Sequence, residues 1–397
     1  MTVLLLFSCL LAFLMFIFKP IAQGHRYDLA LKLSIELLAV WLVFICPARW
    51  LNKKTVLATV LLTGLALGLF QIKSLKPDRE IISTYRSVFQ DLEEGRNPYT
   101  SGQIYHRDAS GQVVYHNFNY PPLELWPYYF FYRIFRRWNE KSLALFLMSL
   151  QLLAGLIVVL AFRKIRPFPL HLLFFLPLLV FSEIKTNPGM TMLMVSLFIL
   201  LLSARRKGES LALDIITASV IGLGVLTKFL FSCIAITFYL WQLYTSLKKN
   251  SQAELKQTAL MISISFLVAL MAILPFGPLN VFKSTILFNL NPGERNLYTT
   301  FYPNVLSGPL YLIDKNWLYP PVAIGAFLLA LWTVRKMSLF PAMLFVSTVF
   351  LLVAPTPEPQ YFGTMLLLAL AGNVMENEPA VDPEELKSRK GAARTAI

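Results

Sequence analysis

The chain has 397 residues, of which 56% are hydrophobic and only 15% are charged. An ordinary soluble domain is about 45 to 50% apolar, so this composition excludes that class and predicts a polytopic integral membrane protein. The formal net charge of +14 does not indicate nucleic-acid binding, because the basic residues form short clusters between apolar runs instead of one basic face.

Apolar runs recur along the chain, and a membrane-spanning helix needs about 20 apolar residues. The polar pair Thr227-Lys228 divides the long run 211–245, which we therefore interpret as two spans that meet at a polar tip. We predict an all-α fold with twelve spans, at residues 3–18, 28–47, 54–72, 141–162, 168–184, 188–203, 211–227, 229–245, 256–275, 317–334, 339–355 and 360–375.

The basic clusters alternate between the two sides of these spans. With a cytoplasmic N-terminus, clusters near residues 49–54, 163–166, 205–207, 248–256 and 335–336 all fall in cytoplasmic loops. This is the pattern that the positive-inside rule describes. It predicts two cytoplasmic termini, two long outer loops at 73–140 and 276–316, and a single membrane domain over 1–375. The polar segment 376–397 is expected to be a disordered cytoplasmic tail.

The first outer loop begins with a stretch typical of an amphipathic helix. Ile81, Ile82, Tyr85, Val88, Phe89 and Leu92 have helical spacing. Asp78 could cap its N-terminus, and Gly95 is a natural stop. Its apolar stripe is expected to lie against lipid or against the bundle. Its other acids, Asp91, Glu93 and Glu94, are expected to be solvated.

The segment "NFNYPPLELWPYYFFYRIFRRW", residues 117–138, combines many aromatic side chains with Arg133, Arg136 and Arg137. Aromatic residues flanked by arginines are typical of the membrane interface. The arginines lie on the predicted outer side, where they could contact a phosphate-bearing ligand or extend towards lipid headgroups. The sequence leaves both possibilities open.

Further polar residues lie at the outer ends of predicted spans, where an ionisable group is costly unless it has a function or reaches the surface. These are Lys185, Asn187 and Lys228, with Arg295 and Tyr298 in the second outer loop. We find no metal-ligand spacing and no glycine-rich nucleotide loop, so we expect no metal and no cofactor.

Four stretches in order resemble the membrane glycosyltransferases of family 87, the polyprenol-phosphate-mannose-dependent mannosyltransferases of the GT-C class. They are "YRSVFQDLEEGRNPY", "FNYPPLELWP", "IKTN" at the start of an apolar span, and "GLGVLTKFLF". The order extends from Asp78 to Lys228. Two positions differ from the family pattern, since Asp78 lies farther from Tyr85 than the usual acid does and Lys185 stands where glutamine is common.

The resemblance implies a GT-C-type fold and inverting transfer of a hexose, with mannose the first candidate, on the outer side of a prokaryotic plasma membrane. The donor would be a polyprenyl-phosphate sugar, and the acceptor would be a hydroxyl of a lipid or glycan. Asp78 is the first choice for general base, with Glu80 as the substitute. The implied substrate-binding residues are Tyr85, Tyr120, Lys185, Asn187, Lys228, Arg295 and Tyr298.

Two other functions are compatible with the span pattern. A secondary transporter or flippase would also have many spans and polar residues at their ends, but such proteins often consist of two similar halves. This chain instead places its largest hydrophilic loop after the third predicted span. A non-catalytic subunit of a membrane assembly would tolerate the loss of Asp78.

Overall fold

A computed structural model describes residues 37, 40, 41, 79–107, 113–162, 189–206, 208, 210–287, 316–354 and 361–377. Within these ranges each predicted span coincides with a helix to within a few residues. The helices are α7 (Glu140–Phe162), α9 (Gly189–Arg205), α10 (Leu211–Gly224), α11 (Phe229–Lys248), α12 (Gln252–Ile273), α17 (Tyr319–Thr333), α18 (Leu339–Val353) and α19 (Phe362–Asn377). The predicted spans at 3–18, 54–72 and 168–184 lie outside the described residues, as does nearly all of 28–47.

Among the helices of the described ranges, two are long and apolar enough to cross a membrane. They are α11, and α12 together with the short helix η3 (Leu274–Phe276) that continues it. The predicted break in the apolar run 211–245 is confirmed as a break between two helices, because α10 ends at Gly224 and α11 begins at Phe229. Thr227 and Lys228 lie in the turn between them, as their polarity indicated.

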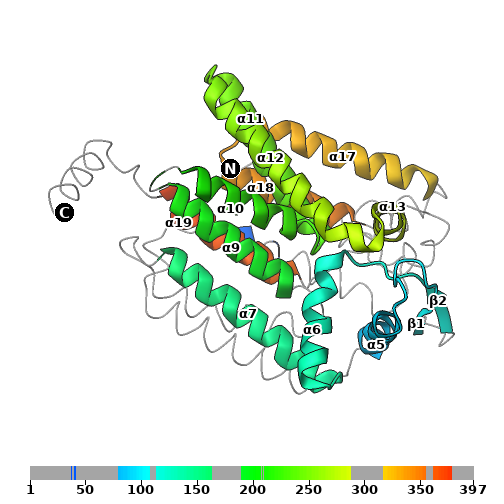
Figure 1. Cartoon of the computed structure of the whole chain (residues 1–397). Coiled ribbons are helices and arrows are strands. Elements are labelled where there is room, and N and C mark those ends of the chain that lie inside the picture. Colours follow the sequence, from blue (N-terminus) through cyan, green and yellow to red (C-terminus); the bar gives the residue numbers. More distant parts are fainter. Residues whose placement is uncertain are drawn as a thin grey trace, which may run out of the picture.

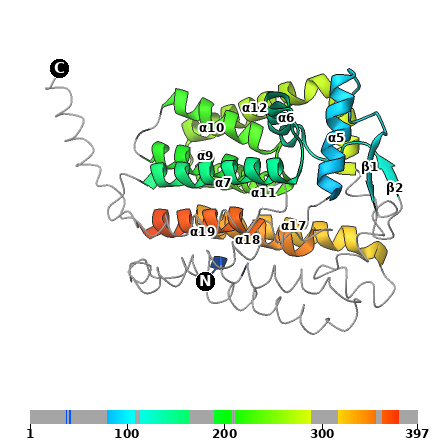
Figure 2. The ribbon, with the colours of Figure 1, turned by 90° about the horizontal axis from the view of Figure 1, so that it is seen from below.

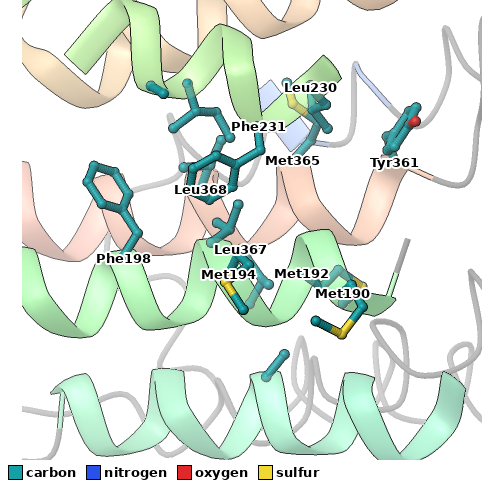
Figure 3. Close-up of a cluster of buried hydrophobic side chains, with 14 of the residues drawn as sticks. Met190, Met192, Met194, Phe198, Leu230, Phe231, Tyr361, Met365, Leu367 and Leu368 are labelled. Atoms are coloured by element: carbon teal, nitrogen blue, oxygen red, sulfur yellow. The ribbon is translucent and has the colours of Figure 1, made fainter. Parts of the chain in front are cut away.

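The long helices pack as a bundle (Figures 1 and 2). Helix α9 contacts α7, α10 and α19, while α11 contacts α12 and α18. Figure 3 shows part of the core, where methionine and phenylalanine side chains of α9 meet the start of α11 and the middle of α19. The labelled core residues are Met190, Met192, Met194, Phe198, Leu230, Phe231, Tyr361, Met365, Leu367 and Leu368.

Helices α10 and α12 approach each other at Gly222. A Cβ atom on Gly222 would lie 2.4 Å from the backbone oxygen of Ser265 and 3.0 Å from its Cα. The Ser265 hydroxyl donates a hydrogen bond of 2.6 Å to the carbonyl of Ala218, one turn away on α10. Small residues at such contacts allow close helix packing, which is common in membrane proteins.

One end of the bundle gathers basic residues at the ends and short turns of its helices. At one end Arg205 of α9 forms an ion pair of 3.0 Å with Asp214 of α10, and Gln257 of α12 donates a hydrogen bond to the same carboxylate. Arg206 donates to the carbonyl of Met375 near the end of α19. The described basic residues Lys248, Lys249, Arg335 and Lys336 belong to this end as well, because α12, which follows Lys249, reaches Asp214 through Gln257, and α11 packs on the short helix η6 (Val334–Lys336).

The other end is covered by the described part of the first predicted outer loop (Figures 1 and 2). This part contains α5 (Arg79–Glu93), strands β1 (Ile104–Arg107) and β2 (Val113–His116), the short helix η2 (Pro122–Glu124) and α6 (Trp126–Phe135). The strands form an antiparallel hairpin in which Ile104 pairs with His116. This hairpin was not predicted from the sequence.

Helix α5 ends as its sequence predicts. The N–H of Gly95 bonds to the carbonyl of Leu92 at 3.3 Å, and the N–H of Arg96 bonds to that of Asp91 at 2.7 Å. These are the two bonds of a Schellman motif. Gly95 adopts a φ of 73°, a conformation that costs a glycine little and other residues more.

The apolar stripe of α5 was expected to lie against lipid or against the bundle, and it lies against protein. Tyr85, Val88 and Phe89 are fully buried or nearly so. The expectation that Asp91 is solvated is wrong, because this residue is buried. Its carboxylate forms an ion pair with Nε of Arg96 at 2.8 Å. The chain reverses after Gly95 and brings Arg96 back over the helix end. Glu93 and Glu94 are exposed, as expected.

The start of the second predicted outer loop lies against the first. This loop begins with α13 (Pro278–Phe282) and the π-helical turn η4 (Lys283–Leu287). The side-chain amide of Asn97 donates to the carbonyl of Phe276 at 2.7 Å, and the Ser284 hydroxyl donates to the carbonyl of Tyr99 at 3.0 Å. Both loops therefore meet at the same end of the bundle.

Candidate functional site

The Y-P-P-L-E segment, Tyr120–Glu124, is fixed from two sides. The Tyr99 hydroxyl donates to the carbonyl of Tyr120 at 2.8 Å, and the Tyr85 hydroxyl donates to the carbonyl of Glu124 at 3.1 Å. On the opposite side, the N–H of Leu123 donates to the carbonyl of Leu226 at 3.0 Å. The segment thus joins α5 to the turn between α10 and α11.

The two prolines explain why side chains hold this segment. Proline has no N–H, and it disfavours helical backbone in the residue before it. Pro121 accordingly has extended backbone, with φ −62° and ψ 155°. Because no regular ladder can form here, the tyrosine hydroxyls provide the donors that the buried carbonyls require.

Lys228 lies directly beside this segment, at the start of α11. Its backbone is extended, with φ −146° and ψ 154°, and its side chain is only 6% exposed. The ammonium nitrogen lies 4.0 Å from the ring centroid of Tyr120. Among the described residues, no hydrogen-bond acceptor or carboxylate pairs with this ammonium. A cation–π contact of this kind is worth about 2 kcal/mol when desolvated, which is less than the cost of burying a charge.

The turn that carries Lys228 is rigid. The buried Thr227 hydroxyl donates to the carbonyl of Gly224 at 2.7 Å and accepts a bond of 3.2 Å from the Thr191 hydroxyl on α9. The positive end of the α11 dipole points to the same place. A lysine and a helix N-terminus together favour a bound anion there.

A buried carboxylate lies in the same region. Glu124 is fully buried among tyrosines. Burial raises the pKa of Tyr85, Tyr99 and Tyr128 well above the usual value of 10.0, and the negative charge of Glu124 raises the pKa of all three further. The hydroxyls of Tyr85 and Tyr99 therefore stay protonated and keep donating to the backbone.

The aromatic rings behind the site form one packed layer. The ring of Tyr85 stacks on that of Tyr120, with centroids 6.4 Å apart and planes inclined by 11°, and it contacts Tyr128 at 4.8 Å. Trp138 packs on Tyr85 at 5.7 Å, and its indole N–H donates to the carbonyl of Ile82 at 3.1 Å. Tyr120 thus contacts both Lys228 and Tyr85.

The structure brings together three of the residues proposed from the sequence, namely Tyr85, Tyr120 and Lys228. Tyr120 and Lys228 contact each other, while Tyr85 is fully buried and supports the site from behind. Glu80 lies in the first turn of α5. The remaining candidates, Asp78, Lys185, Asn187, Arg295 and Tyr298, lie outside the described residues.

No role was predicted for Tyr99 or Glu124 from the sequence. Both stand inside motifs that were noted there, "NPY" and "YPPLE", but their importance depends on contacts between segments that are distant in the sequence. Among the described residues, no three histidine, cysteine, aspartate or glutamate side chains are grouped so that they could hold a metal ion.

Comparison with known proteins gives no relative: no protein family, no curated protein and no solved structure matches the chain.

Proposed function

We propose that the chain is an integral membrane glycosyltransferase of the GT-C type with about twelve transmembrane helices. Its donor is a polyprenyl-phosphate sugar, with mannose as the first candidate, and its acceptor is a hydroxyl of a lipid or glycan on the outer side. The observation that carries the proposal is the buried ammonium of Lys228, which faces the Tyr120 ring and has no anionic partner among the described residues. A phosphate would supply the missing negative charge.

The basic residues at the helix ends and short turns opposite Lys228 support the proposed orientation. Arg205, Arg206, Lys248 and Lys249 belong to the end opposite Lys228. Clusters of this kind favour the cytoplasmic side. Lys228 and both predicted outer loops would then lie at headgroup depth on the outer side, where the phosphate of a lipid-linked sugar is found.

The proposed reaction forms a bond between the sugar C1 and the acceptor oxygen and breaks the bond between C1 and the donor phosphate. The acceptor proton passes to a carboxylate, for which Asp78 is the first candidate and Glu80 the second. The departing polyprenyl phosphate keeps the electron pair of the broken bond. Lys228 stabilises the charge that develops on this phosphate.

The proposal is tested by transfer from polyprenyl phosphate mannose in lipid vesicles that contain the purified chain and crude acceptor lipids. Release of polyprenyl phosphate is measured. Lys228→Gln is expected to slow release by about 100-fold or more, the usual effect of losing a group that stabilises developing charge. Asp78→Asn is expected to abolish it.

Lys249→Gln is the matched control, because Lys249 is an exposed lysine at the opposite end of the bundle, where it pairs with Glu254 at 3.1 Å. It should leave release unchanged. Equal activity of the Lys228 and Lys249 variants would remove Lys228 from the site. Uptake of a solute or lipid by the vesicles without any release of polyprenyl phosphate would favour the transporter or flippase.

A further inference from the structure

Helices α5 and α6 both belong to the cap of the bundle, but they expose opposite kinds of surface. The apolar side chains of α5 are buried in protein, as described above. On α6 the ring of Tyr128 is buried, whereas Phe130 and Phe135 are exposed and Ile134 is 73% exposed. Helix α6 therefore presents an uncovered apolar face, and α5 does not.

Basic side chains border this face. Phe130, Arg133 and Ile134 are spaced i, i+3, i+4 and so lie on one side of α6. The helix ends at Phe135, and Arg137 follows soon after it. We call Phe130, Arg133, Ile134, Phe135 and Arg137 the α6 face.

The two arginines of the α6 face are available to a ligand. Nη1 of Arg133 donates to the Tyr129 hydroxyl at 3.1 Å, and the guanidinium lies 5.8 Å from the ring centroid of Tyr129. Its other N–H groups remain free to donate, since a guanidinium has five. Arg137 pairs with no acidic residue in the described ranges, whereas Arg136 forms an ion pair of 3.3 Å with Glu93.

The α6 face continues the surface of a helix long enough to span a membrane. The ring of Trp126, at the start of α6, stacks on Phe130 and also contacts Phe276, where the membrane-length helix Gln252–Phe276 ends. That helix exposes large apolar side chains over its second half, at Phe266, Leu267, Met271 and Leu274. In Figure 1, α6 runs across the ends of the bundle helices and not along them.

We propose that the α6 face docks on the headgroup region of a lipid leaflet, with Phe130, Ile134 and Phe135 inserted at the acyl boundary and Arg133 and Arg137 bound to phosphates of acidic phospholipids. Apolar side chains flanked by arginines match a surface that is apolar below and anionic above. A guanidinium suits phosphate because it can bind two oxygens at once. This inference does not depend on the transferase proposal.

The depth of the α6 face is measured on the full chain with its cysteines Cys9, Cys46 and Cys233 replaced by alanine. A spin label is placed at Ile134→Cys in lipid nanodiscs, and its collisions with oxygen and with a water-soluble nickel chelate are compared. The label is expected to be open to oxygen and shielded from nickel. Tyr115→Cys, on the exposed hairpin strand β2, is the control and should be open to nickel.

The role of the arginines is measured in nanodiscs of mixed phosphatidylglycerol and phosphatidylcholine, by the enrichment of phosphatidylglycerol on the protein in native mass spectrometry. Arg133→Gln and Arg137→Gln should each weaken the preference about fivefold. Arg136→Gln is the matched control, because Glu93 already neutralises this arginine, and it should change little.

Three results would overturn the proposal. A nickel-accessible label at position 134 would place the α6 face in water. A label shielded from both reagents would mean that a protein or a second copy of the chain covers it. An equal effect of Arg136→Gln and Arg133→Gln would show that the arginines do not bind phosphates individually.

Discussion

The hydroxyls of Tyr99 and Tyr128 offer a matched test of how the Y-P-P-L-E segment is held. Both rings are buried in the same aromatic layer. The Tyr99 hydroxyl donates to the carbonyl of Tyr120 at 2.8 Å, whereas that of Tyr128 has no hydrogen-bond partner among the described residues. Replacing each tyrosine by phenylalanine removes one oxygen and preserves the ring.

The expected effects have opposite signs. Tyr99→Phe loses a bond worth about 1 kcal/mol and leaves a buried carbonyl without its donor, so the free energy of unfolding should fall by about 1–3 kcal/mol. Tyr128→Phe removes a buried polar atom that makes no bond, which should be neutral or stabilising by about 1 kcal/mol. The predicted difference in Tm is a few degrees, roughly 2 °C for each kcal/mol.

Thermal unfolding in nanodiscs measures the global effect, and hydrogen exchange detected by mass spectrometry measures the local one. In Tyr99→Phe the N–H groups of Leu123 and Glu124 should exchange faster, because the segment loses one of its fixed points. In Tyr128→Phe they should exchange as in the wild type. Equal destabilisation by the two substitutions, or unchanged exchange in Tyr99→Phe, would refute the assignment of these bonds.

Two further predictions concern pH and helix packing. The pKa values of Tyr85, Tyr99 and Tyr128 are raised in the folded state, whereas unfolded tyrosine titrates at about pH 10. The free energy of unfolding is therefore at its full value below about pH 10 and falls as the pH rises further. Tyr128→Phe should reduce that fall by about 1 kcal/mol between pH 10 and 11, so an unchanged fall in unfolding experiments over this range would contradict the burial of this hydroxyl. Gly222→Ala should destabilise the chain by about 1–3 kcal/mol, because the new Cβ would meet the Ser265 backbone. Gly325→Ala on α17 is the control. Its Cβ would meet nothing within 4 Å, so this substitution should be neutral or stabilising. Equal Tm values for the two alanine variants would show that α10 and α12 can separate at no cost.

The helices were largely predictable because each depends on a local pattern. Long apolar runs predict α11 and α12, and the polar pair Thr227-Lys228 predicts the break before α11. The spacing of apolar residues and Gly95 predicts α5 and its end. In each case the signal lies within about one helical turn of the feature.

The contacts between distant segments were not predictable in this way. Asp91 lies outside the apolar stripe of α5, which is the position of a solvated residue. Only the reversal of the chain at Gly95 brings Arg96 over it. Glu124 follows two prolines and reads as part of a turn, yet tyrosines from α5, the loop after α5 and α6 enclose it. The hairpin escaped prediction because its strands have only four residues each, too few for a clear alternation of polar and apolar side chains.

The motifs "YPPLE" and "GLGVLTK" meet in the described structure. These two motifs lie about 100 residues apart in the sequence, and the Leu123–Leu226 hydrogen bond and the Tyr120–Lys228 contact join them. The resemblance itself and the sugar, donor and acceptor that it implies stay predictions.

A structure of the chain in nanodiscs with a polyprenyl phosphate mannose bound would test most directly whether Lys228 binds the donor phosphate. We predict that a phosphate oxygen lies within hydrogen-bond distance of Nζ of Lys228, beside the ring of Tyr120 and at the end of the bundle that both predicted outer loops cover. A phosphate found at the opposite end, near Arg205 and Arg206, would contradict this prediction.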